Sequence, residues 1–356
     1  MRDVAVVAFA QSPGTAADRT HDMAEILLPV MREALGTVGI DRSEIDFYAS
    51  GSHDFYEGRT FAYIESLDAV GAWPPISESH VEMDAAWACY EAWSWLQLGE
   101  GDIAVAYGVG RGSLAQDLDQ VMATQLDPYY LAPLRPHRDA LAALQAQALI
   151  ADGALDEQRM AQVVSRCRAA AVGNPAAVVS GEFSADELLA APYTASPLRE
   201  HDSGPIGDAA AVVVLAAGAT ARRLVERPAW IRGADHRMDS HYPGTRDLTR
   251  ADTVPQAAAR AAELAGFGPT AVDVAELHTE YSYQEPLLVD LLGLSDAEIN
   301  PGGGPLTARP TTATGLIRIG EAARHILTGH ADRTLAHATG GPALQQNLIC
   351  LMEADR

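Results

Sequence analysis

The stretch Asn300-Pro-Gly-Gly-Gly304, followed by Ala308-Arg-Pro-Thr-Thr-Ala-Thr-Gly315, decides how this sequence folds. Its glycines and prolines indicate a tight, irregular segment rather than a helix or strand. Directly after it, apolar residues recur at helical spacing over 315–327. Two apolar stretches, 334–337 and 347–352, then predict closing strands. The segment therefore predicts a turn that leads into one helix and two final strands.

Strands and helices alternate outward from this segment in both directions. Strands are predicted at 4–10, 47–49, 81–83, 103–107, 209–215, 229–232 and 272–276. Helices are predicted at 21–35, 85–98, 141–150, 157–171 and 255–265. Gly108-Val109-Gly110 is expected to open a loop. Alternation of this kind predicts a layered α/β architecture, in which helices cover a sheet.

The alternation is interrupted once, which suggests how the chain is organised. Residues 111–200 are mostly helical and loop-like, and we interpret them as an insert. The predicted divisions are an N-terminal half whose first part is 1–110, the insert 111–200, a closing strand of that half within 201–226, and a C-terminal half 227–356.

Composition excludes several classes of function. The chain has 356 residues, of which 48% are hydrophobic, and a formal net charge of -23. Such an acidic surface repels nucleic acid and anionic lipid headgroups, so neither is expected as a partner. The three cysteines, Cys89, Cys167 and Cys350, are odd in number and far apart, which argues against disulfides and a cysteine zinc site. We expect a cytoplasmic protein without a metal.

Four segments, in this order, resemble conserved blocks of the thiolase superfamily. They are Gly99 to Gly110, Pro192 to Leu215, Val274-Ala-Glu-Leu-His-Thr-Glu-Tyr281, and the opening stretch 300–315 with the tail 335–347. The third is similar to the Glu-Leu-His-Asp-Ala-Phe block of sterol-carrier-type thiolases. The resemblance implies the thiolase fold, with five layers (α-β-α-β-α) built from two similar halves and a helical loop insert.

The resemblance also shows which catalytic groups are absent. Thiolases use a cysteine thiolate at a helix N-terminus, a Gly-His-Pro histidine and a second cysteine in a C-terminal loop. Counting back about five helical turns from Gly99 places the first cysteine position within 82–85, which contains none. Cys89 lies about one turn inside the predicted helix, where helix N-terminal amides do not lower a thiol pKa. The other two positions read Arg309 and Ala343.

The remaining candidate residues come from the same blocks. His278 matches the family's oxyanion-hole residue, and Tyr281 and Tyr283 beside it are candidates for acid–base work. Arg309 cannot act as a base, but it can bind a carboxylate or phosphate. Gly340 and Gly341, in the C-terminal loop, are expected to contact substrate. The cluster 235–241 fits no standard zinc spacing and is expected to be a solvated loop.

Three functions are compatible with these residues. The first is a cysteine-independent retro-aldolase that cleaves acyl-CoA carbon–carbon bonds in lipid or steroid side-chain breakdown, working with an OB-fold acyl-CoA-binding chain, as the resemblance implies. The second is a catalytically degenerate subunit that scaffolds an active thiolase-like partner, in a dimer or heteromer. The third is an acyltransferase that uses Cys89. In each, the substrate is an acyl-CoA and no further cofactor is expected.

Overall fold

The structure, a computed structural model, describes residues 2–58, 60–115 and 117–355. Its main feature is a set of ten strands in one continuous order, β10-β9-β11-β12-β8-β1-β7-β4-β2-β3. The strands of the first half are β1 (Val4–Gln11), β2 (Phe47–Gly51), β3 (Glu78–Val81), β4 (Ile103–Arg111) and β7 (Asp208–Ala217). Those of the second half are β8 (Ala229–Met238), β9 (Val274–Glu276), β10 (Glu298–Ile299), β11 (Arg333–Gly340) and β12 (Gln346–Glu353).

The two halves repeat the same topology. If the strands of each half are numbered in chain order, both sets have the spatial order 3-2-4-5-1. In both, the second strand pairs in parallel with its two neighbours, and the remaining pairs are antiparallel. The halves meet where β1 pairs with β8 over only two positions, Ala5 with Trp230 and Val6 with Ala229. The chain is therefore a structural duplication.

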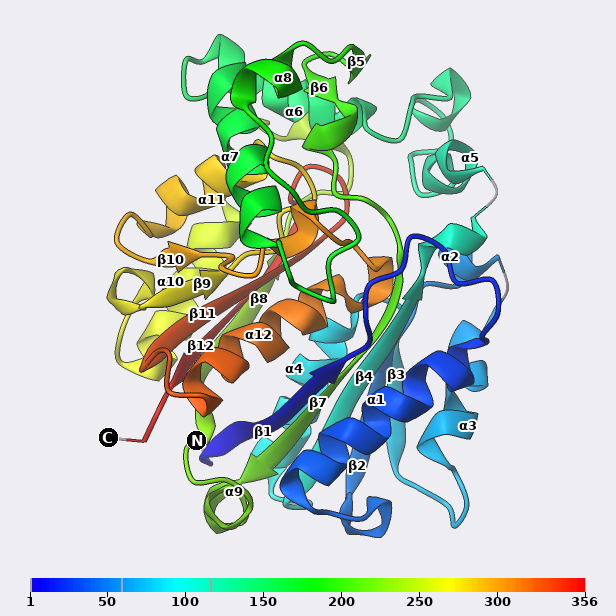
Figure 1. The fold of residues 1–356 in the computed structure, drawn as a ribbon, viewed down its shortest axis with the longest axis vertical. Coiled ribbons are helices and arrows are strands. Elements are labelled where there is room, and N and C mark those ends of the chain that lie inside the picture. Colours follow the sequence, from blue (N-terminus) through cyan, green and yellow to red (C-terminus); the bar gives the residue numbers. More distant parts are fainter. Residues whose placement is uncertain (1, 59, 116, 356) are drawn as a thin grey trace.

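Helices form three layers around the strands, which confirms the predicted thiolase fold. The central helices α4 (Ala85–Leu98) and α12 (Thr314–Leu327) pack together in one apolar core against strands of both halves. On the outer faces, α1 (Met23–Val38) and α3 (Leu67–Val70) cover the first half, and α10 (Thr253–Ala265) and α11 (Gln284–Leu292) cover the second. Figure 1 shows α12 lying between the strands of the two halves.

Local sequence explains where the central helix α4 begins and ends. The Asp84 side chain accepts a hydrogen bond from the Ala86 N–H, and Gly99, at φ 81°, ends the helix in the left-handed conformation. Half of its buried residues are alanines, whose small side chains let α4 approach β4 and α12 closely. The predicted range 85–98 is confirmed.

Between β4 and β7 the chain leaves the sheet. This region contains α5 (Leu118–Ala123), α6 (Ala140–Ala151), α7 (Glu157–Ala170), α8 (Ala185–Leu189) and a small sheet of β5 (Tyr193–Ala195) and β6 (Leu198–Arg199). In Figure 1, α6, α7 and α8 lie above the sheet. They hold two apolar clusters of their own, one of which contains Tyr281 and Tyr283 from the second half. This packing fixes the region against the segment that follows β9.

Some local expectations were wrong. Gly108-Val109-Gly110 does not open a loop, because β4 continues to Arg111 and pairs with β7 along its whole length. The third strand covers Glu78–Val81 rather than 81–83. Residues 235–238 belong to β8 and pair with β12 instead of forming a solvated loop. Strand pairing overrides the local turn signal of Gly108-Val109-Gly110, and it also extends β8 through 235–238.

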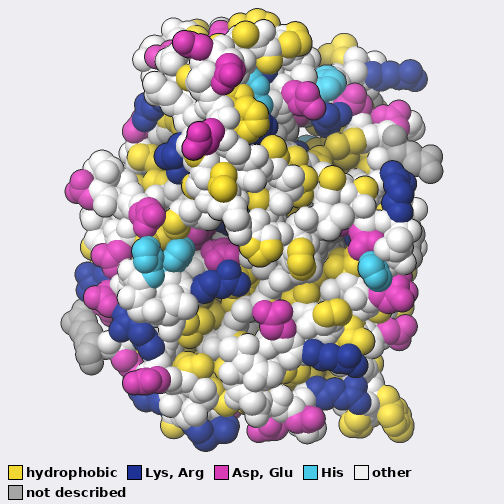
Figure 2. Space-filling view, viewed as in Figure 1, with side chains coloured by type: hydrophobic (Ala, Val, Ile, Leu, Met, Phe, Trp, Pro, Cys, Tyr) yellow, Lys and Arg dark blue, Asp and Glu magenta, His cyan; other side chains and the backbone are white. Residues whose placement is uncertain are grey.

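The surface carries both signs of charge. Figure 2 shows acidic and basic side chains mixed over the visible face, together with histidines and small apolar areas. The structure also contains the short helices α2 (Asp54–Glu57) and α9 (Gly218–Leu224). Within the described ranges, no helix has the length and apolar character required for crossing a membrane.

Candidate functional site

A cavity of about 550 Å³ opens where α2, α5 and the start of α6 face the segments that follow β9 and β11. This volume is typical of small-molecule sites. Apolar side chains provide much of the wall, namely Phe55, Met83, Trp87, Met122, Leu126, Leu141 and Ala142. Ionisable and hydrogen-bonding groups on the wall include His53, Tyr56, Asp84, His278, Glu280, Tyr281 and Gln284.

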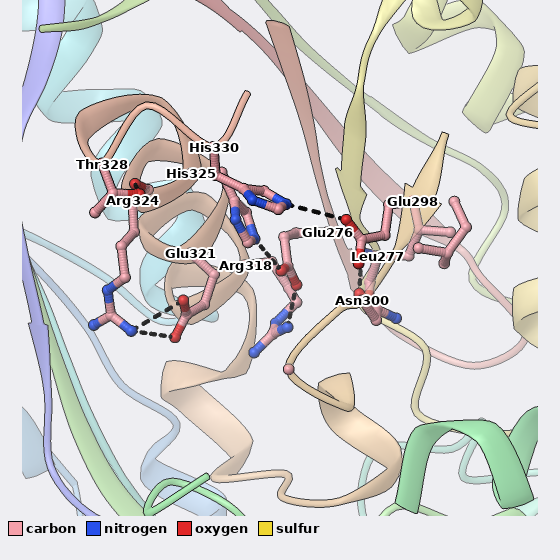
Figure 3. A network of polar contacts seen from close by, with 12 residues as sticks. Glu276, Leu277, Glu298, Asn300, Arg318, Glu321, Arg324, His325, Thr328 and His330 are labelled. Carbon is pink, nitrogen blue, oxygen red and sulfur yellow. Dashed lines mark hydrogen bonds and ion pairs between the residues drawn. The ribbon is translucent and has the colours of Figure 1, made fainter. Parts of the chain in front are cut away.

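The backbone leading into this cavity is held by buried polar contacts (Figure 3). Glu276, at the end of β9, pairs with Arg318 of α12, and its other carboxylate oxygen lies 3.1 Å from His325 Nε2. The Asn300 side chain accepts from the Leu277 N–H at 2.8 Å and donates to the Leu277 carbonyl at 3.2 Å. Because Leu277 is clamped in this way, the position of the next residue, His278, is fixed relative to α12.

His278 lines the cavity and carries a neutral N–H donor. Its Nδ1 accepts a hydrogen bond from the Thr339 N–H at 3.3 Å, so the ring proton belongs on Nε2. Among the described residues, Nε2 has no hydrogen-bond partner. Burial lowers the pKa of His278 well below its usual value, so the ring stays uncharged at neutral pH. Such a buried, unpaired donor is suited to bind an oxygen of a ligand.

The two predicted tyrosines have different positions. Tyr281 lines the cavity, and its hydroxyl donates to Asp139 Oδ1 at 3.0 Å. Tyr283 is fully buried, donates to Gln145 Oε1 at 2.9 Å and does not line the cavity. Burial raises the pKa of both phenols, so both remain protonated at neutral pH. Only Tyr281 is therefore placed to contact a ligand.

Arg309 lies behind the cavity wall instead of lining it. Its guanidinium is buried, with Nη1 at 3.4 Å from Glu280 Oε1 and the guanidinium carbon 5.6 Å from the Tyr281 ring centre. The Glu280 side chain is 34% exposed and does line the cavity. Sequence reasoning did not select Glu280. The only signal was an acid two residues after His278 in the quoted block.

The C-terminal loop contributes backbone and small side chains. Gly340, Gly341 and Ala343 all line the cavity. Gly341 has φ 73°, a left-handed backbone conformation in which a residue with a Cβ is strained. The loop thus approaches the cavity closely without supplying a thiol.

Asp84 lies within 82–85, the range in which the resemblance predicts a nucleophilic cysteine. Its carboxylate accepts from the Ala86 N–H of α4 at 2.8 Å, and from Gly315 and Leu316 of α12 at 2.8 and 3.2 Å. Burial nevertheless raises the pKa of Asp84 to about 7, against the lowering effect of these three donors. The carboxylate caps two helices and also lines the cavity.

The cysteines are remote from this chemistry. Cys89, Cys167 and Cys350 are all buried, and none of them lines the cavity. Burial raises the pKa of Cys350 to about 12 and also raises that of Cys89, so neither forms a thiolate at neutral pH. In the described part of the chain, no group of three or more His, Cys, Asp or Glu side chains is arranged to hold a metal ion.

No family model matches the sequence. An acetyl-CoA acetyltransferase from Methanothermobacter thermautotrophicus is 26% identical over 96% of this chain and 97% of its own length. The benzoylsuccinyl-CoA thiolase subunit BbsB of Thauera aromatica is 25% identical, covering 74% of this chain and 68% of that protein. Sterol carrier protein 2 of Bos taurus is 26% identical over 50% of this chain and 37% of that protein.

Solved structures agree in fold over the whole chain. Human mitochondrial 3-ketoacyl-CoA thiolase has a TM-score of 0.81 at 13% identity, covering 100% of this chain and 99% of that one. A structure described as an Ltp2-ChsH2(DUF35) aldolase has a TM-score of 0.80 at 18% identity, covering 99% and 98%. At these identities the likeness shows the shared fold.

Proposed function

The chain is a thiolase-superfamily protein similar to the sterol-carrier type, and from this premise we propose that it cleaves a β-hydroxyacyl-CoA by a cysteine-independent retro-aldol reaction. The observation that carries the proposal is a neutral His278, with a buried and unpaired Nε2–H, in the lining of a cavity that contains no thiol. A retro-aldol step needs an enolate stabiliser and an acid–base group, but no nucleophile.

The two residues at the cavity have complementary roles in this proposal. As the bond between the α- and β-carbons breaks, negative charge develops on the thioester oxygen, and the His278 Nε2–H stabilises it. The protonated Tyr281 phenol donates to the oxygen on the β-carbon and orients it. Asp139 accepts from Tyr281 in the absence of substrate and fixes the phenol direction. Each role needs the neutral, protonated form that burial favours.

The cavity supports a bulky apolar acyl group. Its volume and its Phe, Trp, Met and Leu side chains suit a ring system better than an acetyl group. We therefore propose a steroid or similar lipid side chain on coenzyme A as substrate, in the cytoplasm, with no additional cofactor. The aldolase named among the structural neighbours is a two-component protein by its description. We extend that arrangement here and propose an OB-fold partner that binds the acyl-CoA.

A second candidate is a non-catalytic subunit that completes a thiolase-like assembly. It is favoured by the same lack of thiols at both family positions, where Asp84 and Ala343 now line the cavity. The acyltransferase alternative has no comparable support, because Cys89 is buried outside the cavity and its thiol pKa is raised.

Co-expression with its thiolase-like and OB-fold partners, followed by assay of the purified complex with a steroid β-hydroxyacyl-CoA, tests the proposal. We expect cleavage that falls by about 100-fold or more in His278→Ala, the typical effect of losing one oxyanion donor. Tyr281→Phe should also lose activity. Tyr283→Phe is the matched control, because it removes an equally buried hydroxyl outside the cavity. Activity that survives both cavity mutations would make this chain a structural subunit.

A further inference from the structure

Four carboxylates line the cavity and have no role above, namely Asp54, Glu82, Asp84 and Glu280, and Glu280 lies beside His278. Glu280 Oε1 lies 3.9 Å from His278 Nε2 and 3.4 Å from Arg309 Nη1. The first separation is too long for a direct hydrogen bond, and it leaves room for a substrate oxygen near both groups. Glu280 thus shares one wall of the cavity with the donor that would stabilise an enolate.

Arg309 holds this carboxylate from behind. The arginine is buried, and its backbone is tied to the loop before β7, because its N–H donates to the Pro205 carbonyl at 2.9 Å and its carbonyl accepts from the Gly207 N–H at 3.3 Å. The guanidinium also lies over the Tyr281 ring. A buried cation fixed at both ends restricts where the Glu280 carboxylate can sit.

Three other titratable groups of the cavity, Tyr281, His278 and Asp84, are poorly suited to remove a proton. Tyr281 stays protonated, and the His278 Nδ1 lone pair already accepts from Thr339. Both Asp84 oxygens accept backbone hydrogen bonds at the helix ends. Glu280, by comparison, is partly open to the cavity and paired only on one oxygen among the contacts of the described residues.

We infer that Glu280 is the base of the reaction and that Arg309 is its positioning residue, an assignment that rests on the proposed function. Glu280 takes the proton of the β-hydroxyl, and the O–H electrons form the new carbonyl as the bond between the α- and β-carbons breaks. The bonding pair passes to the thioester as an enolate held by His278. Protonated Glu280 then returns the proton to the α-carbon, giving a ketone or aldehyde and a shortened acyl-CoA.

Two readouts separate this inference from the proposed function. The first is cleavage of the steroid β-hydroxyacyl-CoA by the co-expressed complex. The second is exchange of the α-protons of propionyl-CoA in D₂O, followed by NMR, which needs the base and the enolate stabiliser but no carbon–carbon cleavage. The variants are Glu280→Gln, Glu280→Asp and the control Glu263→Gln, a surface glutamate of α10 paired with Arg260.

We expect Glu280→Gln to lower both rates by about 10²- to 10⁴-fold, the usual contribution of a general base, and Glu280→Asp to recover part of the loss. Glu263→Gln should behave as wild type. Exchange without cleavage in the wild type, abolished in Glu280→Gln, would support the base and overturn the proposed reaction. Cleavage that persists in Glu280→Gln would overturn the base and leave the reaction standing. Wild type lacking both activities would overturn both.

Arg309→Gln distinguishes positioning from substrate binding. If Arg309 only orients Glu280, kcat should fall by about 10- to 100-fold with KM nearly unchanged, since small misplacements of a catalytic group have effects of that size. A raised KM with an unchanged kcat would instead mean that Arg309 contacts the substrate, and it would overturn the positioning role.

Discussion

Replacing Asn300 by alanine should destabilise the protein, because it removes the side chain that hydrogen-bonds the Leu277 backbone. Asn300 is fully buried, and its amide satisfies both the N–H and the carbonyl of Leu277. The Leu277 carbonyl still accepts from the Thr279 N–H at 3.0 Å, so the substitution leaves only the Leu277 N–H without a partner, at a cost of about 1–3 kcal/mol. Alanine also has to adopt φ 46° at this position, which adds about 1–2 kcal/mol for a residue with a Cβ.

The assay is urea unfolding followed by circular dichroism, with two companion variants. Asn300→Gly loses the same hydrogen bonds but tolerates the left-handed backbone, so it should be about 1 kcal/mol more stable than Asn300→Ala. Asn174→Ala is the matched control, because Asn174 also makes two side-chain bonds to backbone, with Gly302 and Ala176, but at a hydrated position. It should lose less than about 1 kcal/mol. The reasoning is refuted if Asn300→Ala costs no more than Asn174→Ala.

Two further predictions concern titration and thiol reactivity. Burial lowers the pKa of His337 from 6.5 to about 4 in the folded protein. Between these two pH values the unfolded chain binds one more proton than the folded chain, so the free energy of unfolding falls as pH is lowered from 6.5 toward 4. Between pH 6.5 and pH 4, the free energy of unfolding of the wild type should therefore fall by about 3 kcal/mol relative to that of His337→Gln, measured by paired urea titrations. A difference between the two proteins that does not change with pH would contradict this. Iodoacetamide should alkylate the three buried cysteines at least about 100-fold more slowly in native than in urea-unfolded protein, as followed by mass spectrometry. Fast native labelling of Cys89 would revive the acyltransferase alternative.

The elements that sequence could predict are those with strong local signals. The strand β7 is buried on both faces and reads as a continuous apolar run, and α4 has a capping Asp84 and a terminating Gly99. The two-residue β10 and the helix α11 were not predicted. β10 is too short for periodicity, and α11 begins directly after an irregular polar segment. Their positions depend on pairing with β9 and packing against α10, which act across the fold.

The site was predictable in its segments but not in its geometry. The blocks with His278 and with Gly340 were selected from sequence, and the structure places both at one cavity. Tyr281 reaches this cavity, whereas Tyr283 packs against α6. This difference depends on the direction of side chains in a segment without regular structure, which sequence does not specify. Arg309 was expected to bind substrate because a lone arginine suggests an anion. Its actual neighbour, Glu280, comes from a different part of the chain.

The duplication of halves explains why the place of the missing thiolate is filled by another group. The helices α4 and α12 follow equivalent strands of the two halves, and their N-terminal N–H groups converge on one point. Two helix ends favour an anion there. In this chain that anion site is filled by Asp84, whose carboxylate approaches so closely that a Cβ on Gly315 would lie 2.6 Å from its Oδ1. The amides that could activate a thiolate therefore donate to Asp84 instead. The polar groups that we assign to the reaction come from the segment after β9, which carries His278 and Glu280.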